Sequence, residues 1–99
     1  MSYNIPSDVE EKLKSFFKKF NFINKIVVFG SRARGDNSSK SDIDLCIYSL
    51  GMTPQEYRKL KLDLNELPIL YKIDIVHFEN SSDELKKNIL KDEKLFLTL

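Results

Sequence analysis

A strand–helix–strand pattern in the middle of the chain is the sequence feature that most limits the possible folds. The apolar runs DIDLCIYS (42–49) and ILYKIDIVHF (69–78) each predict a strand. Between them, TPQE (53–56) has capping-box spacing with proline at the first helical position, and apolar residues recur at helical intervals to Leu67. A helix in this position suits a right-handed crossover between parallel strands.

The other elements are predicted from the same periodicities. An amphipathic helix is expected over residues 8–20, a short buried strand over 25–30, and a single helical turn at 31–34 that is closed by Gly35. A last helix is expected over 81–96. The predicted fold class is α/β (α+β), with a small mixed β-sheet of about three strands and helices packed on it.

Length and composition narrow the class of protein. The 99 residues predict one domain, 1–99, without room for a separate acceptor-binding domain. A net charge of +1 argues against direct binding to nucleic acid or to an anionic membrane. Cys46 is the single cysteine, and no apolar stretch approaches the length of a membrane span. We therefore expect a cytoplasmic protein.

Three carboxylates in the predicted strands point to metal chemistry. Side chains alternate along a strand, so Asp42 and Asp44 share a face and repel each other unless a cation lies between them. Mg²⁺ prefers oxygen ligands and is commonly held by one or two carboxylates plus substrate phosphates. Asp74 lies between two isoleucines, where a charge without a purpose would be costly.

A glycine-containing turn supplies the groups expected to bind an anion. Gly30 at a strand end lets the backbone approach a ligand closely, and the free N–H groups of the turn that begins at Ser31 point at an anion. Arg32 and Arg34 add positive charge beside this turn. If Gly30 ends one strand and Asp42 begins its antiparallel neighbour, the turn and the carboxylates meet at one end of the sheet. This arrangement suits a nucleoside triphosphate with its metal.

The motif GSRARGDNSSKSDIDL (30–45), followed by Asp74, resembles the signature of the DNA polymerase β nucleotidyltransferase superfamily. It is most similar to the minimal nucleotidyltransferase (MNT) antitoxins of HEPN/MNT toxin–antitoxin pairs. The resemblance implies a nucleotidyltransferase that uses ATP and two Mg²⁺ ions. Asp42, Asp44 and Asp74 would hold the ions, and Asp74 would also accept the proton of the attacking hydroxyl.

The resemblance also implies a ligand set and a partner. Gly30, Ser31, Arg32 and Arg34 would bind the nucleotide. AMP would be transferred to a tyrosine hydroxyl of a HEPN-domain toxin, which makes the chain a protein adenylyltransferase in a hetero-oligomer. We expect contact points for such a partner at exposed apolar positions, for instance Phe17 or Leu97.

Two other functions remain open at this stage. One is a non-catalytic antitoxin that neutralises its partner by binding, and the other is a transferase that acts on a small molecule or an RNA end. The three intact carboxylates favour an enzyme, and the short chain disfavours an independent acceptor domain. His77 has the opposite strand parity to Asp74 and is expected to face away from the site, while Cys46 is expected to be buried filler.

Overall fold

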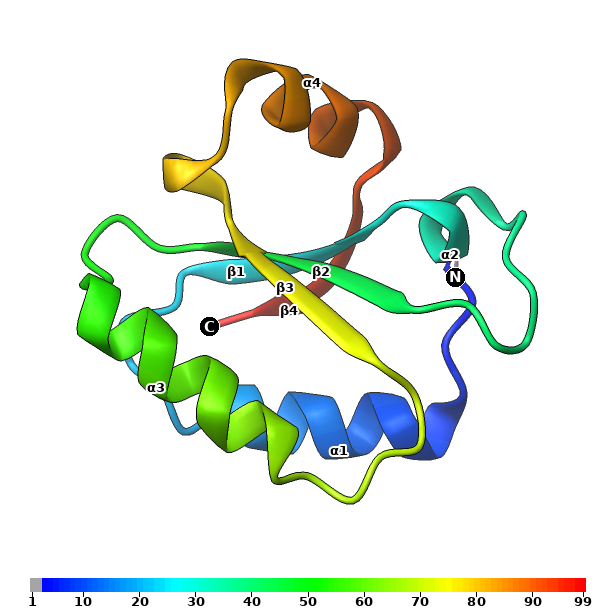
Figure 1. The fold of residues 1–99 in the computed structure, drawn as a ribbon, viewed down its shortest axis with the longest axis horizontal. Helices are drawn as coiled ribbons and strands as arrows, with labels where there is room; N and C mark the ends of the chain where they lie inside the picture. Colours follow the sequence, from blue (N-terminus) through cyan, green and yellow to red (C-terminus); the bar gives the residue numbers. More distant parts are fainter. Residues whose placement is uncertain (1–2) are drawn as a thin grey trace.

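The computed structural model describes residues 3–99 and forms a four-stranded sheet with helices on both faces (Figure 1). None of the helices in this range is long and apolar enough to cross a membrane. In chain order the elements are α1 (Ser7–Phe17), β1 (Lys25–Phe29), α2 (Ser31–Arg34), β2 (Ile43–Tyr48), α3 (Pro54–Asn65), β3 (Ile73–His77), the 3₁₀ helix η1 (Phe78–Asn80), α4 (Asp83–Asp92) and β4 (Lys94–Thr98).

The strand order β3-β2-β1-β4 confirms the predicted mixed sheet. β2 and β3 are parallel and connected through α3, as the strand–helix–strand pattern predicts. β1 is antiparallel to both of its neighbours. The capping box of α3 forms as expected, because the Thr53 hydroxyl accepts from the Glu56 amide while the Glu56 carboxylate accepts from the Thr53 amide.

The prediction of a last helix over 81–96 is wrong for its last four residues. α4 ends at Asp92, and β4 follows as a fourth strand at the sheet edge. The register between β1 and β4 shifts at Ile26/Val27, so that Phe96 and Leu97 are both buried although they are adjacent. This irregularity removes the period-2 alternation by which a strand is recognised, and Phe96 then continues the helical spacing of α4.

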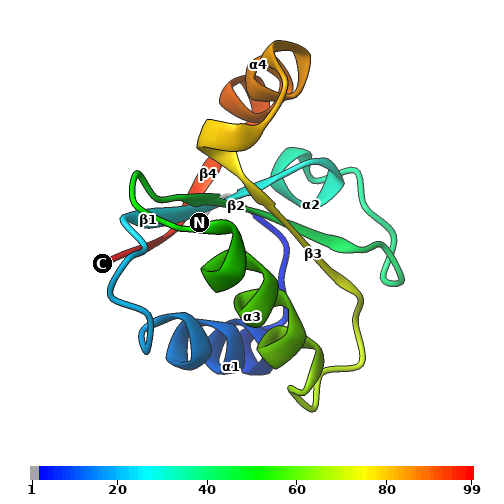
Figure 2. The same cartoon turned by 60° about the vertical axis from the view of Figure 1, so that its left-hand side comes forward.

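Two apolar layers hold the helices to the sheet (Figures 1 and 2). α1 and α3 cover one face, where Leu13 and Leu60 are completely buried in the larger core cluster. α4 covers part of the other face, where Ile89 packs on Val27 and Cys46. The two faces therefore differ, since the α4 side has only a small apolar cluster and leaves the rest of its strands available for polar residues.

Two further expectations about the helices are corrected by the structure. Phe17 is completely buried and Leu97 is nearly so, because both belong to the core beneath α1 and α3, and neither is an exposed contact point. α1 spans Ser7–Phe17 and is shorter than the expected 8–20. It begins after Pro6 without a side-chain cap, and the Glu10 carboxylate forms an ion pair with Lys14.

Replacement of Phe17 tests this assignment to the core. Phe17→Ala removes a fully buried ring that packs edge-on to Phe16, with 5.2 Å between the ring centroids, and should lower the free energy of unfolding by about 3–5 kcal/mol. Leu70→Ala is the matched control, since Leu70 is fully exposed and should change stability by less than about 0.5 kcal/mol. Urea titration followed by circular dichroism would measure both values, and equal effects would contradict the burial of Phe17.

Candidate functional site

Strand pairing brings two predicted site residues together at one end of the sheet. Asp44 in β2 is the direct partner of Asp74 in parallel β3, and on its other side Asp44 pairs with Phe29, the last residue of β1. Gly30 follows Phe29 directly, and Asp42 lies just before the start of β2. The turn and the carboxylates thus meet at the same end of the sheet, next to α2 (Figure 1).

Gly30 is required at its position by backbone conformation and by space. Its φ of +77° lies in a region that side chains disfavour. A Cβ atom at this position would lie 2.6 Å from the Asp44 Oδ2 atom, which is closer than real Cβ contacts allow. Glycine therefore allows the β1–α2 turn to approach the Asp44 carboxylate, as expected for backbone that must come close to a bound group.

The carboxylates lie on the α4 side of the sheet but beyond the apolar cluster that α4 covers. Alternation places Asp44 on the same face as Cys46, and Asp74 on the same face as Val76, which packs against that cluster. The side chains of Asp42 and Asp74 are 46% and 44% exposed. Solvent and a ligand can therefore reach the carboxylates, and the cost of burying Asp74 that the sequence suggests is largely avoided.

The electrostatics of the cluster reflect this crowding of like charges. Burial raises the pKa of the Asp44 carboxyl, and the negative charges of Asp74 and Asp42 raise this pKa further. Arg34 and Lys72 act in the opposite direction. A bound cation would relieve the unfavourable environment of the ionised Asp44 carboxylate.

The residues of the cluster fit a magnesium site that is completed by a substrate. Across residues 3–99, no three acidic, histidine or cysteine side chains converge closely enough to form a metal site by themselves. The donors of Asp42, Asp44 and Asp74 are all oxygen atoms, and Mg²⁺ commonly takes one or two carboxylates and fills its remaining positions with water and phosphate. The space kept free by Gly30 beside Asp44 suits such a ligand.

Arg32 holds the backbone around the site. The residue is only 2% exposed, and its guanidinium donates to the backbone carbonyl oxygens of Asn4 (2.8 Å) and Ser41 (2.9 Å). The guanidinium also lies over the Tyr71 ring, 5.1 Å from the centroid. Ser41 precedes Asp42 directly, so this side chain orders the segment that carries the first carboxylate. The geometry favours positioning over the phosphate contact expected from the sequence.

Ser31 and Arg34 are the first and last residues of α2, which directly follows Gly30. Arg34 donates to the carboxylates of Asp36 (Nε to Oδ2, 3.1 Å) and Asp92 (Nη1 to Oδ2, 2.9 Å), which links α2 to the end of α4. Ser31 is the first residue of α2, so its amide is among the N–H groups that lack a partner within the helix. Both residues remain predicted nucleotide ligands.

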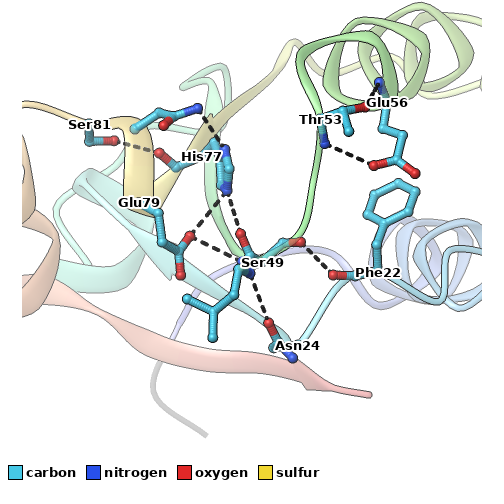
Figure 3. A network of polar contacts seen from close by, with 10 residues as sticks. Phe22, Asn24, Ser49, Thr53, Glu56, His77, Glu79 and Ser81 are labelled. Atoms are coloured by element: carbon cyan, nitrogen blue, oxygen red, sulfur yellow. Dashed lines mark hydrogen bonds and ion pairs between the residues drawn. The ribbon is translucent and has the colours of Figure 1, made fainter.

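His77 belongs to a separate polar network (Figure 3). Alternation along β3 places His77 on the face opposite to Asp74. Its Nε2 atom lies 2.7 Å from the backbone oxygen of Ser49 and 3.2 Å from the Glu79 carboxylate. The network joins the carboxyl ends of β2 and β3, whereas Asp44 and Asp74 lie near the beginning of these strands. The expectation that His77 faces away from the site is confirmed. Cys46 is completely buried, and burial raises the pKa of its thiol to about 12, which agrees with a packing role.

Comparison with known families decides which family this site belongs to. Residues 11–98 match the family model described as polymerase beta, nucleotidyltransferase. The chain belongs to this family. It is a nucleotidyltransferase with the polymerase β-like fold, and its sheet has four strands where about three were expected. No curated protein sequence matches the chain.

Solved structures with the same fold include toxin–antitoxin complexes. A toxin–antitoxin complex with AMP-PNP has a TM-score of 0.74 at 20% identity, covering 91% of this chain and 73% of that chain. A complex of the tri-AMPylated HEPN toxin of Shewanella oneidensis with its MNT antitoxin has a TM-score of 0.62 at 17% identity, covering 94% and 72%. A protein assigned as a minimal nucleotidyltransferase has a TM-score of 0.66 at 28% identity, covering 89% of both chains.

One residue at the site was missed in the sequence. The Lys72 ammonium lies 4.0 Å from the Asp42 carboxylate and 3.9 Å from the Asp74 carboxylate. Its position two residues before Asp74 in an extended segment was the available signal, since that spacing places both side chains on one face.

Two glycine variants would test the close approach at Gly30. Gly30→Ala and Gly35→Ala both put a side chain at positive φ, but only the Gly30 variant meets Asp44, because nothing lies within 4 Å of a Cβ at Gly35. Gly35 is in the left-handed helical region, where alanine should cost about 1–2 kcal/mol of stability, whereas the conformation of Gly30 is one that essentially only glycine adopts, and alanine there should cost about 1–3 kcal/mol. Only Gly30→Ala should weaken the binding of a magnesium–nucleotide complex, by roughly tenfold or more for a displaced carboxylate. Isothermal titration calorimetry would measure this, and equal binding by both variants would rule out the proposed contact.

Removal of the Asp44 charge should stabilise the fold. The raised pKa means that the ionised carboxylate is less favourable in the folded than in the unfolded chain, so its contribution to stability falls as the pH rises through the folded pKa. After allowance for solvent screening, Asp44→Asn should gain roughly 0.5 kcal/mol at pH 7, a Tm rise of about 2–4 °C. The gain should disappear in acid, below the unfolded pKa. A Tm at or below that of the wild type at pH 7 would contradict the repulsion described above.

Proposed function

We propose that this chain is a Mg²⁺-dependent protein adenylyltransferase that transfers AMP from ATP to a tyrosine hydroxyl of a HEPN-domain partner and so acts as its antitoxin. The observation that carries the proposal is the arrangement of Asp44 beside Asp74 across paired strands, with the Gly30 turn against Asp44 and Asp42 two residues away. Plain binding to a toxin would not require this arrangement.

The order of groups across the sheet supports a direction for the reaction. The Gly30–Ser31 turn follows β1, Asp44 lies on β2 inside the sheet, and Asp74 lies on β3, one of the two edge strands. The triphosphate would lie against the turn, with the Ser31 hydroxyl and amide and Arg34 on its phosphates. The acceptor hydroxyl would then approach from the β3 side, opposite to the departing group, as an in-line displacement requires.

The proposed step balances as a simple displacement at the α-phosphorus. The acceptor oxygen forms a bond to the α-phosphorus, the bond from this phosphorus to the bridging oxygen breaks, and pyrophosphate leaves with that electron pair. Asp74 accepts the proton of the attacking hydroxyl. Asp42, Asp44 and Asp74 would hold two Mg²⁺ ions, which when bound supply positive charge to the attacking and leaving oxygens.

The partner is proposed from the likeness to the toxin–antitoxin complexes. One of them contains a tri-AMPylated HEPN toxin with an MNT antitoxin, and another contains AMP-PNP, an analogue of ATP. These proteins share the fold of this chain at 17–20% identity.

Transfer of a labelled α-phosphate would test the function. The protein would be incubated with Mg²⁺ and ATP labelled at the α-phosphate in a lysate that contains the product of the neighbouring gene. We expect label on one protein band, no label from γ-labelled ATP, and a loss of at least 100-fold for Asp44→Asn or Asp42→Asn. Asp63→Asn is the matched control, because Asp63 pairs with Lys59 on the surface of α3, away from the site.

Three outcomes would change the conclusion. Full transfer by Asp42→Asn or Asp44→Asn would show that the carboxylate assignment is wrong. Label on an RNA or a small molecule would redirect the function to another acceptor class. Tight binding to a partner without any transfer would indicate a blocking antitoxin with a silent site.

A further inference from the structure

The positive charges near the carboxylates are engaged in different ways. Arg32 is buried and donates to backbone carbonyl oxygens. Arg34 is held by the carboxylates of Asp36 and Asp92. Lys72 instead lies directly at the cluster, because its ammonium is within ion-pair distance of Asp42 and of Asp74 at once. A single ammonium therefore lies between two carboxylates that are proposed to hold metal.

The backbone of Lys72 is fixed although its side chain is free to move. Its carbonyl oxygen accepts from the Ile43 amide at 2.9 Å, and this bond joins the start of β3 to the residue between Asp42 and Asp44. The side chain is 71% exposed, and both contacts with the carboxylates are near 4 Å. A flexible four-carbon stem on a fixed backbone allows the ammonium to leave without disturbance of the strand.

Lys72 borders a groove along the outer edge of β3. The groove has a volume of about 290 Å³, lies along the open edge of β3, and is bordered by Lys61, Asn65, Tyr71, Lys72 and Asp74. Lys61 lies over the Tyr57 ring, 5.4 Å from its centroid, and within residues 3–99 it forms no ion pair with Asp42 or Asp74. Because the Lys72 side chain is 71% exposed, its ammonium can move away from the carboxylates into solvent.

We propose that Lys72 is the resident counter-ion of the carboxylate cluster and competes with the divalent cation for Asp42 and Asp74. Without metal, the positive charge of Lys72 offsets part of the repulsion between the carboxylates. When the metal binds, the ammonium is displaced into solvent. The inference rests on the proposed metal-dependent function, and it makes Lys72 a positioning residue that sets the metal concentration at which the site fills.

Metal binding without nucleotide or acceptor tests this competition directly. Free Mn²⁺, used as a probe for Mg²⁺, would be measured by electron paramagnetic resonance during titration of the isolated protein at low ionic strength. Lys72→Met removes the competing charge and should tighten Mn²⁺ binding by roughly threefold to tenfold, as expected for a unit charge about 4 Å from the ligands in a solvent-exposed site. Lys72→Arg keeps the charge and should bind Mn²⁺ like the wild type.

Lys61→Met is the matched control, since it removes a lysine from the same groove that is not paired with the carboxylates, and it should leave Mn²⁺ affinity unchanged. Equal Mn²⁺ affinity of wild type and Lys72→Met, or weaker binding by the variant, would overturn the role of Lys72 while leaving the proposed enzyme intact. Absence of Mn²⁺ binding by every form, with and without nucleotide, would overturn the metal-dependent function as well. If no AMP transfer is detected while the Mn²⁺ affinities differ as predicted, the proposed reaction is wrong and the role of Lys72 stands.

Discussion

The pairing of Asp44 with Asp74 across two parallel strands is the constraint around which this structure is arranged. Backbone hydrogen bonds hold the two carboxylates in register although their charges repel, and burial together with that repulsion raises the pKa of Asp44. The central strand can support the arrangement because its other face is completely buried under α1 and α3. The stability of that core offsets a destabilising cluster, as is common at catalytic sites.

Each basic residue near the cluster has a different environment and therefore a different task. Arg32 has a planar guanidinium that can satisfy several carbonyl oxygens at once, so it suits a buried position that orders the segment before Asp42. Arg34 joins α2 to α4 through two carboxylates at the surface. Lys72 has an exposed ammonium within 4.0 Å of the Asp42 and Asp74 carboxylates, and it is the one proposed to give way to a metal ion. Residue type and burial together determine which basic side chains hold the backbone in place and which face the carboxylates.

Local sequence pattern is sufficient to predict those elements whose stabilising contacts lie nearby in the chain. The strand–helix–strand unit and the α3 capping box formed as predicted, because each depends on neighbours within a few residues. β4 was mistaken for helix because a register shift against β1 buries both Phe96 and Leu97. Phe17 was expected at the surface, yet the sheet buries it completely. In each of these failures the deciding contact lies on a segment distant in the chain.

The sequence by itself determined the residue types of the site, the class of chemistry they suit and the family, because the Gly30–Ser31 turn, Asp42, Asp44 and Asp74 are local features with recognisable spacing. Only the tertiary structure decided which charges meet. The register of β2 and β3 sets Asp44 beside Asp74, burial commits Arg32 to the backbone, and the open edge of β3 leaves Lys72 at the carboxylates. Electrostatic interactions depend on distance and solvent exposure, and for residues far apart in the chain these are properties of the fold.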